Sequence, residues 1–237
     1  MAERELEVFE QGITVVIPVY NGEKYIQKCI QSVLNQIEEP KYVIIVDDGS
    51  RDGSIGEIRK AANDVPNTFL CTFFHKNRGA NAARNFGMLG VKTEYSIILD
   101  VDAVYYPKMF KKMKEELDKD ASISFVYSNY HRIYSGRPGD MLLSIPFSKE
   151  VLLDHNYISM CSMFRTTIFK PFDEHITALQ DWDFWLDKVT SGHKGKWINE
   201  PLFEAIMPDT GITMGLQKDA KKYKEARDAV KSKYISG

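Results

Sequence analysis

The chain has 237 residues, of which 43% are hydrophobic, so it can bury a sizeable core as one domain with two lobes. Its 31 Lys and Arg residues nearly balance its 33 Asp and Glu residues, which gives a formal net charge of -2. Nucleic-acid-binding proteins attract phosphate with a basic field that this chain lacks, and we therefore expect no nucleic-acid partner.

Cysteine usage and the first residues predict a cytoplasmic protein. The three cysteines are far apart and odd in number, which fits neither a disulfide framework nor zinc-ligand spacing: Cys29, Cys71 and Cys161. The segment MAERELEVFEQG lacks the apolar core of a signal peptide, and no stretch approaches the roughly 18 apolar residues of a membrane span. Any membrane contact is therefore expected to be peripheral.

In the first half, short apolar runs alternate with amphipathic stretches. This pattern predicts an α/β fold in which helices cover both faces of a mostly parallel sheet. ITVVIPVY (13–20) is a strand, and Asn21 is placed to cap the next helix, whose apolar residues recur at helical spacing from Ile26 to Leu34. YVIIVDDGS (42–50) supplies a second strand, and RDGSIGEIRKAA (51–62) a second helix.

Two further strands follow, TFLCTFFH (68–75) and YSIILD (95–100). The segment between them, NRGANAARNFGMLGV (77–91), predicts a helix in which small residues, Gly87 among them, allow close packing on the sheet. After the fourth strand, Pro107 is placed in the first turn of the helix PKMFKKMKEELDKD (107–120).

The second half predicts a strand-rich lobe. SISFVYSNYHRIYSG (122–136) alternates like an antiparallel strand, and SGRPGD (135–140) is a turn signal. The last segment, 215–237, is a lysine-rich helix candidate, for which we favour a solvated terminal helix. Contact with an anionic membrane surface is the alternative.

Four acidic residues follow predicted strands: Asp47 and Asp48 after the second, and Asp100 and Asp102 after the fourth. Ligands of open parallel sheets bind beyond the carboxyl ends of the strands. Because like charges repel unless a cation or hydrogen-bond donors neutralise them, this gathering indicates a site.

The Asp100-Val101-Asp102 triplet has two interpretations. Aspartate is common at strand ends as a turn or helix-cap residue. In an extended chain, however, residues i and i+2 face the same side, so both carboxylates can face one cation. Carboxylate oxygens suit Mg²⁺ or Mn²⁺, which fill their other positions with substrate phosphates and water. Such a site would need a diphosphate.

Asp48 is either a turn residue or an acceptor for the N3-H of a uracil or thymine ring. No G-x-G-x-x-G follows the first strand, and no G-x-x-x-x-G-K-S/T occurs in the sequence. Nicotinamide and ATP-hydrolysis functions therefore lose their main support.

Five motifs, VVIPVYN, VIIVDDGSRDGS, NRGANAARNFG, LDVDA and LQDWDFWL, resemble in that order the motifs of glycosyltransferase family two, the inverting sugar transferases of the GT-A fold. The resemblance covers Ile13 to Met207. It implies a hexosyl- or N-acetylhexosaminyl-transferase with a nucleotide-sugar donor, here favoured as a UDP-sugar, and with Mn²⁺ or Mg²⁺. The acceptor would be a hydroxyl of a glycan or glycolipid, attacked by direct displacement.

The resemblance also implies one GT-A domain over residues 1–237. Its donor lobe would span 13–103, its acceptor lobe 104–207, and a C-terminal loop and basic helix 208–237. Asp102 would ligate the metal directly, and Asp100 would contact the ribose or the metal shell. The other residues implied to bind the donor are Pro18 and Tyr20 beside the nucleoside, Asp48 or the adjacent Asp47 at the base, and Arg78 or Arg84 near the donor. For Arg84, an ion pair with a neighbouring carboxylate is an equally weighted alternative to donor binding.

Asp181 aligns with the aspartate that acts as general base in the family, and its alternative role is a helix cap. The residues after it form an apolar helical stripe: Trp182, Trp185, Leu186 and Val189. Asp183 and Asp187 are four apart on the other side, so we expect both to be solvated.

Three departures from the family pattern keep other functions open. Gln180 stands where the family often has Glu, and Ala103 where it often has a second acid. Residues 206–214, IMPDTGITM, lack the Arg or His that closes over the diphosphate in many relatives. The alternatives are an inactive nucleotide-sugar-binding module and a sugar-1-phosphate nucleotidyltransferase. The latter should carry a glycine-rich basic loop after the first strand, where this chain has IPVYNGEKYIQ.

Overall fold

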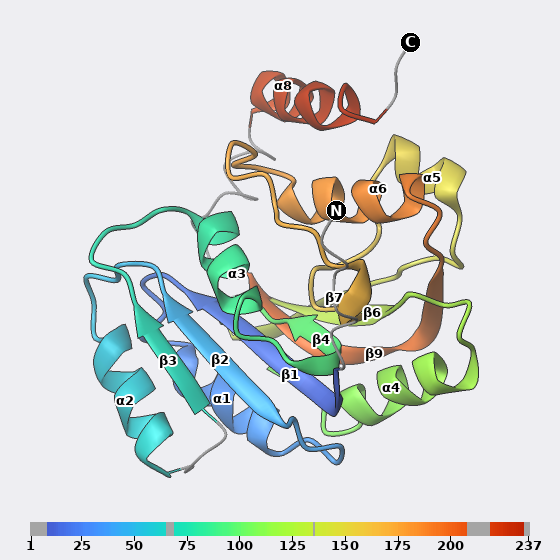
Figure 1. The fold of residues 1–237 in the computed structure, drawn as a ribbon. Helices are drawn as coiled ribbons and strands as arrows, with labels where there is room; N and C mark the ends of the chain where they lie inside the picture. Colours follow the sequence, from blue (N-terminus) through green and yellow to red (C-terminus); the bar gives the residue numbers. More distant parts are fainter. Residues whose placement is uncertain (1–8, 65–68, 135, 208–218, 235–237) are drawn as a thin grey trace, which may run out of the picture.

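A single curled sheet organises the protein, seen here in a computed structural model that describes residues 9–64, 69–134, 136–207 and 219–234. Its strands run in the order β3-β2-β1-β4-β8-β6-β9-β5, and β7 adds to β6 (Figure 1). Helices pack on both faces of this sheet. Because the faces are covered, a ligand site can form only where the strands end.

The first half of the sheet is parallel, as predicted. Hydrogen bonds join β1 to β2 and β4, and β2 to β3, all in parallel register. The elements of this half are β1 (Glu10–Val19), α1 (Ile26–Leu34), β2 (Tyr42–Asp47), α2 (Ser54–Asp64), β3 (Phe69–Phe73), α3 (Ala80–Met88) and β4 (Thr93–Ile98). Because the strands are parallel, the residues that follow β1, β2 and β4 meet at one edge.

The second half of the sheet is mixed. Its elements are β5 (Ala103–Tyr105), α4 (Met109–Lys119), β6 (Phe125–Tyr134), β7 (Arg137–Leu142), α5 (Lys149–Asp154), β8 (Met163–Arg165), η1 (Thr166–Ile168), α6 (Gln180–Thr190), β9 (Gly195–Met207) and α8 (Ala220–Lys231). β6 is antiparallel to β7 and β8, as its alternation predicted, but parallel to β9. The antiparallel pairing of β5 with β9 brings the end of β9 beside the Asp-Val-Asp triplet.

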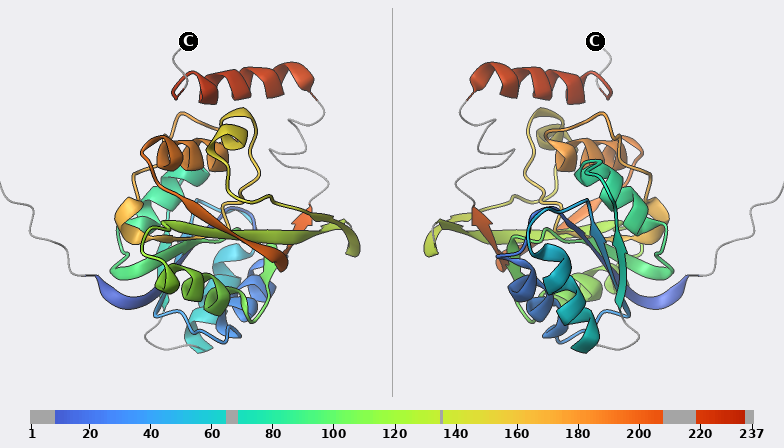
Figure 2. Two further views of the ribbon diagram at one scale, coloured as in Figure 1. Left: turned by 90° about the vertical axis from the view of Figure 1, so that its right-hand side faces the viewer. Right: turned by 90° about the vertical axis from the view of Figure 1, so that its left-hand side faces the viewer.

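Helices cover both faces of the sheet, which confirms the expected layers (Figures 1 and 2). One buried cluster joins β1, β2 and β4 to α1, α2 and α4. A second cluster joins the opposite face to α3, α5 and α6 and includes Val230 of α8. The close packing expected at Gly87 is present, because a Cβ built there would lie 2.4 Å from Val16 Cγ1.

Two predicted helix starts are wrong. Helix α1 begins at Ile26 and has no side-chain cap. Asn21 instead accepts a hydrogen bond from the Arg51 backbone at 2.9 Å, in a left-handed conformation with φ of 52°. Pro107 lies just outside α4, because the Met109 N-H bonds the Tyr106 carbonyl in a tight turn before the helix.

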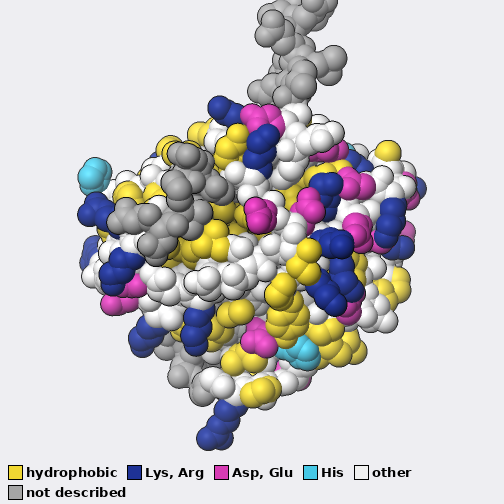
Figure 3. All heavy atoms as spheres, turned by 90° about the horizontal axis from the view of Figure 1, so that it is seen from below, with side chains coloured by type: hydrophobic (Ala, Val, Ile, Leu, Met, Phe, Trp, Pro, Cys, Tyr) yellow, Lys and Arg dark blue, Asp and Glu magenta, His cyan; other side chains and the backbone are white. Residues whose placement is uncertain are grey.

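The C-terminal helix α8 is largely exposed, as predicted, but one side is anchored. Arg227 and Lys231 pair with Asp154 at 2.7 and 2.9 Å, and Val230 is fully buried. Acidic and basic side chains are interspersed on the face opposite α8 (Figure 3). Within the part of the chain that the structure describes, no helix is long and apolar enough to cross a membrane.

Candidate active site

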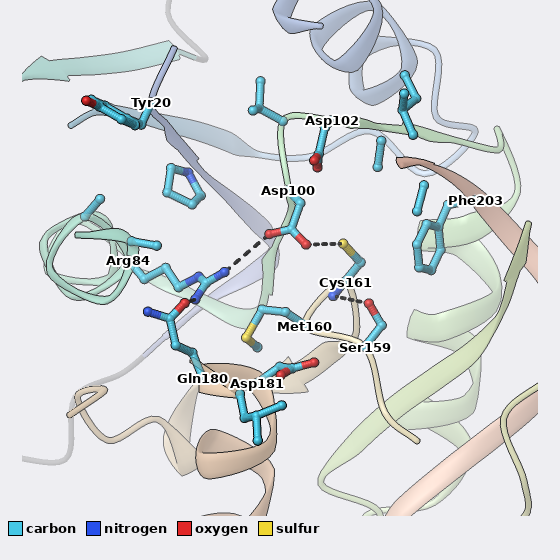
Figure 4. A pocket seen from close by; sticks show the side chains of 18 of the residues that line it. Tyr20, Arg84, Asp100, Asp102, Ser159, Met160, Cys161, Gln180, Asp181 and Phe203 are labelled. Atoms are coloured by element: carbon cyan, nitrogen blue, oxygen red, sulfur yellow. Dashed lines mark hydrogen bonds and ion pairs between the residues drawn. The ribbon is translucent and has the colours of Figure 1, made fainter. Parts of the chain in front are cut away.

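A cleft of about 750 Å³ opens at the edge where β1, β2 and β4 end. The segment 156–161, the start of α6 and the end of β9 complete its walls (Figure 4). Of the segment IMPDTGITM, residues 208–214 lie outside the described residues, while Ile206 and Met207 line the cleft. The predicted donor, metal and catalytic residues that line it are Pro18, Tyr20, Asp48, Arg84, Asp100, Asp102 and Asp181.

Asp48, which lines the cleft, is held in place by the loop before α3. Its two carboxylate oxygens accept hydrogen bonds from the backbone N-H groups of Arg78 at 2.7 Å and Gly79 at 2.8 Å. The residue is only 2% exposed, and this burial raises the pKa of its carboxyl despite the two bonds. Each oxygen keeps a lone pair with which it can accept a further hydrogen bond.

Asp47 and the Arg78 side chain do not line the cleft. Asp47 is fully buried, and its Oδ1 accepts a hydrogen bond from the Ser50 N-H at 2.9 Å, so it shapes the turn after β2. The Arg78 guanidinium lies over the Phe74 ring and 3.9 Å from Glu174. Arg78 therefore reaches Asp48 through its backbone alone.

Arg84 connects α3 with two other parts of the cleft. Its Nη2 lies 3.3 Å from Asp100 Oδ1, and its Nη1 donates to Gln180 Oε1 at 3.1 Å (Figure 4). Nη1 also donates to Asn81 Oδ1 at 3.2 Å. The residue is 7% exposed, and its guanidinium packs on the Phe172 ring. The ion pair weighed from the sequence is therefore present, in a side chain that also lines the cleft.

Asp100 has three partners that the sequence did not indicate, one of which is the Cys29 thiol, 3.8 Å from the Asp100 carbonyl oxygen. The buried Cys161 thiol lies 3.8 Å from Asp100 Oδ2, and the Tyr105 hydroxyl donates to the Asp100 carbonyl at 2.7 Å. Burial raises the pKa of Cys161, so the thiol keeps its proton and acts as a weak donor. No motif surrounds Cys161, which lies two residues before β8, the strand that pairs with β4.

Asp102 lies beyond Asp100 on the same side of the cleft (Figure 4). Burial, followed by the charge of Asp100, raises the pKa of Asp102 to about 7. No cluster of three or more His, Cys, Asp or Glu residues suited to a metal occurs within the described ranges. Two neighbouring carboxylates nevertheless fit Mg²⁺ or Mn²⁺, which commonly take one or two protein carboxylates and complete their shell with phosphate and water.

Asp181 faces the cleft from the first turn of α6. The N-cap position of α6 is Leu179, which makes no side-chain cap hydrogen bond, whereas the Asp181 side chain binds one N-H of the first turn. Its Oδ1 accepts from the Trp182 N-H at 2.9 Å, and its Oδ2 accepts from Asn156 Nδ2 at 2.9 Å. Burial raises the pKa of Asp181. Asn156 was not identified from the sequence, because it lies 25 positions away in an irregular segment.

The expected solvation of Asp183 is wrong. Asp183 is 4% exposed, and its Oδ1 lies 2.7 Å from Lys233 Nζ and 2.9 Å from the Tyr234 hydroxyl. Asp187 is partly buried and lies 2.7 Å from the buried Lys188 ammonium. Helical periodicity separates the sides of α6, but it cannot reveal that the segment after α8 covers the second side.

Comparisons with known proteins agree with this geometry. The family model described as Glycosyl transferase family 2 matches residues 14–176. An uncharacterized glycosyltransferase of Rickettsia typhi is 31% identical, over 73% of this chain and 57% of its own length. One of Methanocaldococcus jannaschii is 27% identical, over 89% of this chain and 76% of its own. The chain thus spans little more than half the length of the Rickettsia relative.

Solved structures share the fold. S. aureus TarS 1-349 in complex with UDP-GlcNAc aligns with a TM-score of 0.76 at 17% identity, over 93% of this chain and 65% of that chain. A mannosyltransferase from Pyrobaculum calidifontis, in complex with GDP-Man and Mn²⁺, aligns with a TM-score of 0.65 at 17% identity, over 91% and 65%. From the family match over residues 14–176, we conclude that the chain belongs to glycosyltransferase family 2 and has the GT-A fold.

Proposed function

We propose that this protein is a metal-dependent inverting glycosyltransferase that transfers a hexosyl or N-acetylhexosaminyl group from a UDP-sugar to a hydroxyl of a glycan or glycolipid. One observation carries the proposal. A single cleft gathers a carboxylate suited to a base ring, two carboxylates suited to a divalent cation, and a partly buried carboxylate suited to proton transfer: Asp48, Asp100 with Asp102, and Asp181.

The donor would occupy the side formed by β1, β2 and α3. Its uracil would lie beside Pro18 and Tyr20 and donate its N3-H to Asp48. Between the two candidate arginines, the geometry favours Arg84, because Arg84 lines the cleft and the Arg78 side chain does not. A bound nucleotide sugar in TarS and a bound GDP-Man with Mn²⁺ in the mannosyltransferase support a donor of this class in this fold.

Asp100 and Asp102 would hold the Mn²⁺ or Mg²⁺ ion. When bound, the ion would stabilise the negative charge that develops on the departing diphosphate. Burial, followed by the charge of Asp100, raises the pKa of Asp102, and a bound cation would offset this repulsion between the two carboxylates.

Asp181 would take the proton of the acceptor hydroxyl. As the hydroxyl oxygen bonds the anomeric carbon, the bond from that carbon to the diphosphate breaks, and UDP leaves with the bonding electrons. Attack from the face opposite the leaving group inverts the configuration. The raised pKa of Asp181 suits this role, because a general base works best when its pKa approaches the working pH.

The lobes follow from these roles, with donor residues in 13–103 and acceptor residues in 104–207 of one domain. Membrane contact through α8 is a separate prediction. It would involve the exposed Lys221, Lys222 and Lys224, because Arg227 and Lys231 anchor the other side of the helix to Asp154. Lys221 and Lys222 pair only within the same segment, with Glu225 at 3.9 Å and Asp219 at 3.4 Å.

Thermal-shift measurements with UDP-, GDP-, CDP- and dTDP-sugars, with Mn²⁺ or with EDTA, test the donor assignment. We expect a UDP-sugar to raise the melting temperature only with metal, because a ligand of the native state stabilises it by mass action. The same titration of Asp102→Asn should give no metal-dependent shift. A metal-independent shift, or a preference for CDP- or GDP-sugars, would contradict the assignment. Binding without release of UDP would favour the inactive binding module.

A further inference from the structure

One contact at the proposed general base joins two separate parts of the acceptor side. Asn156, in the segment after α5, donates from Nδ2 to Asp181 Oδ2 at 2.9 Å. The orientation of this amide is fixed, because its Oδ1 accepts a hydrogen bond from the Ile158 N-H at 3.1 Å. The NH₂ group must therefore face the carboxylate.

Hydrogen bonds also fix the backbone next to Asn156. The Tyr157 carbonyl accepts from Ser144 Oγ at 2.8 Å, and the Tyr157 hydroxyl bonds both the N-H and the carbonyl of Ser148 at 2.8 and 2.9 Å. These bonds tie the segment to the stretch between β7 and α5. Asn156 consequently presents its amide from a fixed position.

The charged and titratable groups around Asp181 have opposite effects on the ionisation of its carboxyl. Burial and the charge of Asp100 disfavour the ionised carboxylate, while Arg84 and the Trp182 N-H favour it. The Tyr130 phenol on β6 also lies within electrostatic reach of Asp181. Asn156 adds a second N-H donor, and a hydrogen bond from a donor to a carboxylate stabilises the charged form.

We propose that Asn156 is the positioning residue of Asp181, which keeps that carboxylate ionised and in one orientation towards the acceptor hydroxyl. The inference rests on the proposed function, in which Asp181 accepts the proton. The Trp182 N-H engages Oδ1 and Asn156 engages Oδ2, so the carboxylate cannot rotate freely. One lone pair on each oxygen stays available for the acceptor proton.

The test compares Asn156→Ala, Asn156→Asp and the control Asn199→Asp. Asn199 is exposed and lies outside the lining of the cleft, so the control makes the same charge change elsewhere. The titration of Asp181 is followed by ¹³C NMR in protein labelled at aspartate carboxyls, with Asp181→Asn to assign the signal. Hydrolysis of the UDP-sugar, with water in place of the acceptor, gives the pH-rate profile.

Loss of the amide donor should raise the Asp181 midpoint by about one pH unit in Asn156→Ala. The acid limb of hydrolysis should move in the same direction, with an unchanged KM for the donor. Asn156→Asp preserves the shape of the side chain and adds a negative charge beside Asp181, so the acid limb of its hydrolysis profile should move at least as far as that of Asn156→Ala. If the alanine variant does not fold, Asn156→Asp alone decides the test. Asn199→Asp should shift neither quantity.

An unchanged midpoint in Asn156→Ala, or an unchanged acid limb in both variants, would overturn the inference. A midpoint that moves in a protein that hydrolyses no nucleotide sugar would support the coupling of the two residues and contradict the proposed function instead.

Discussion

The carboxylate of Asp48 and the backbone N-H of Gly79 are joined by a hydrogen bond of 2.8 Å, which ties the end of β2 to the start of α3. The Arg78 N-H completes the contact at 2.7 Å. The residue proposed to recognise the base thus also organises the loop that borders the cleft.

Asp48→Asn should therefore have two effects. The amide can face only one of the two N-H donors with its oxygen, so the free energy of unfolding should fall by about 1–3 kcal/mol, measured by urea denaturation. Affinity for UDP should fall more than affinity for CDP. Uracil loses the carboxylate acceptor of its N3-H, whereas cytosine has no N3-H and therefore loses no such hydrogen bond. A UDP-to-CDP ratio equal to that of the parent, measured by calorimetry, would remove Asp48 from base recognition.

Asp102 predicts an unusual pH dependence of stability in EDTA. Its pKa is raised from 3.8 to about 7, so the unfolded chain releases this proton near pH 4 while the folded protein keeps it until about pH 7. Stability from this group is therefore lost as the pH rises between those values, by on the order of 4 kcal/mol. Asp102→Asn should match the parent near pH 4 and exceed its melting temperature at pH 8. Equal melting temperatures at pH 8 would show that Asp102 ionises freely in the fold.

The close contact of Gly87 with β1 should make α3 intolerant of a larger side chain at this position. A Cβ at this position would lie 2.4 Å from Val16 Cγ1, so Gly87→Ala should cost about 1–3 kcal/mol of unfolding free energy. Gly56 in α2 is the matched control, because a Cβ there meets nothing within 4 Å. Gly56→Ala should be neutral or stabilising by about 0.5–1 kcal/mol. If chemical denaturation gives equal effects for the two variants, α3 does not depend on this close approach.

The contacts of Asp183 with Lys233 and Tyr234 should stabilise α6. Asp183→Ala would leave the Tyr234 hydroxyl without its carboxylate partner and remove one partner of Lys233, so we expect a loss of about 1–3 kcal/mol. Asp228→Asn, at an exposed position on α8, should stay within about 0.5 kcal/mol of the parent. Both are compared by thermal unfolding, where an Asp183 variant as stable as the Asp228 control would refute the anchoring.

The sequence predicted the parts of this protein that depend on local pattern. The β-branched runs and their alternation with helical segments predicted the parallel half of the sheet. Asp48, Asp100 and Asp102 could be predicted to line one cleft because they follow strands whose carboxyl ends meet at one edge of the sheet. Asn156 and Cys161 could not be predicted, since they reach the site through long-range packing of irregular segments. Asp183 was misjudged for the same reason: the covering residues Lys233 and Tyr234 lie about 50 positions further along the chain.

The central claim is that Asp181 removes the acceptor proton in an otherwise complete donor site. Asp181→Asn keeps the shape of the side chain and abolishes its basicity, and Asp228→Asn is the control at an exposed position. The decisive measurement is sugar transfer by these variants, with UDP and Mn²⁺ affinity determined by calorimetry on the same samples. We expect Asp181→Asn to keep its donor affinity while transfer falls by roughly 10² to 10⁴, and Asp228→Asn to match the parent. Full transfer by Asp181→Asn, or a product that retains the anomeric configuration of the donor, would contradict the account.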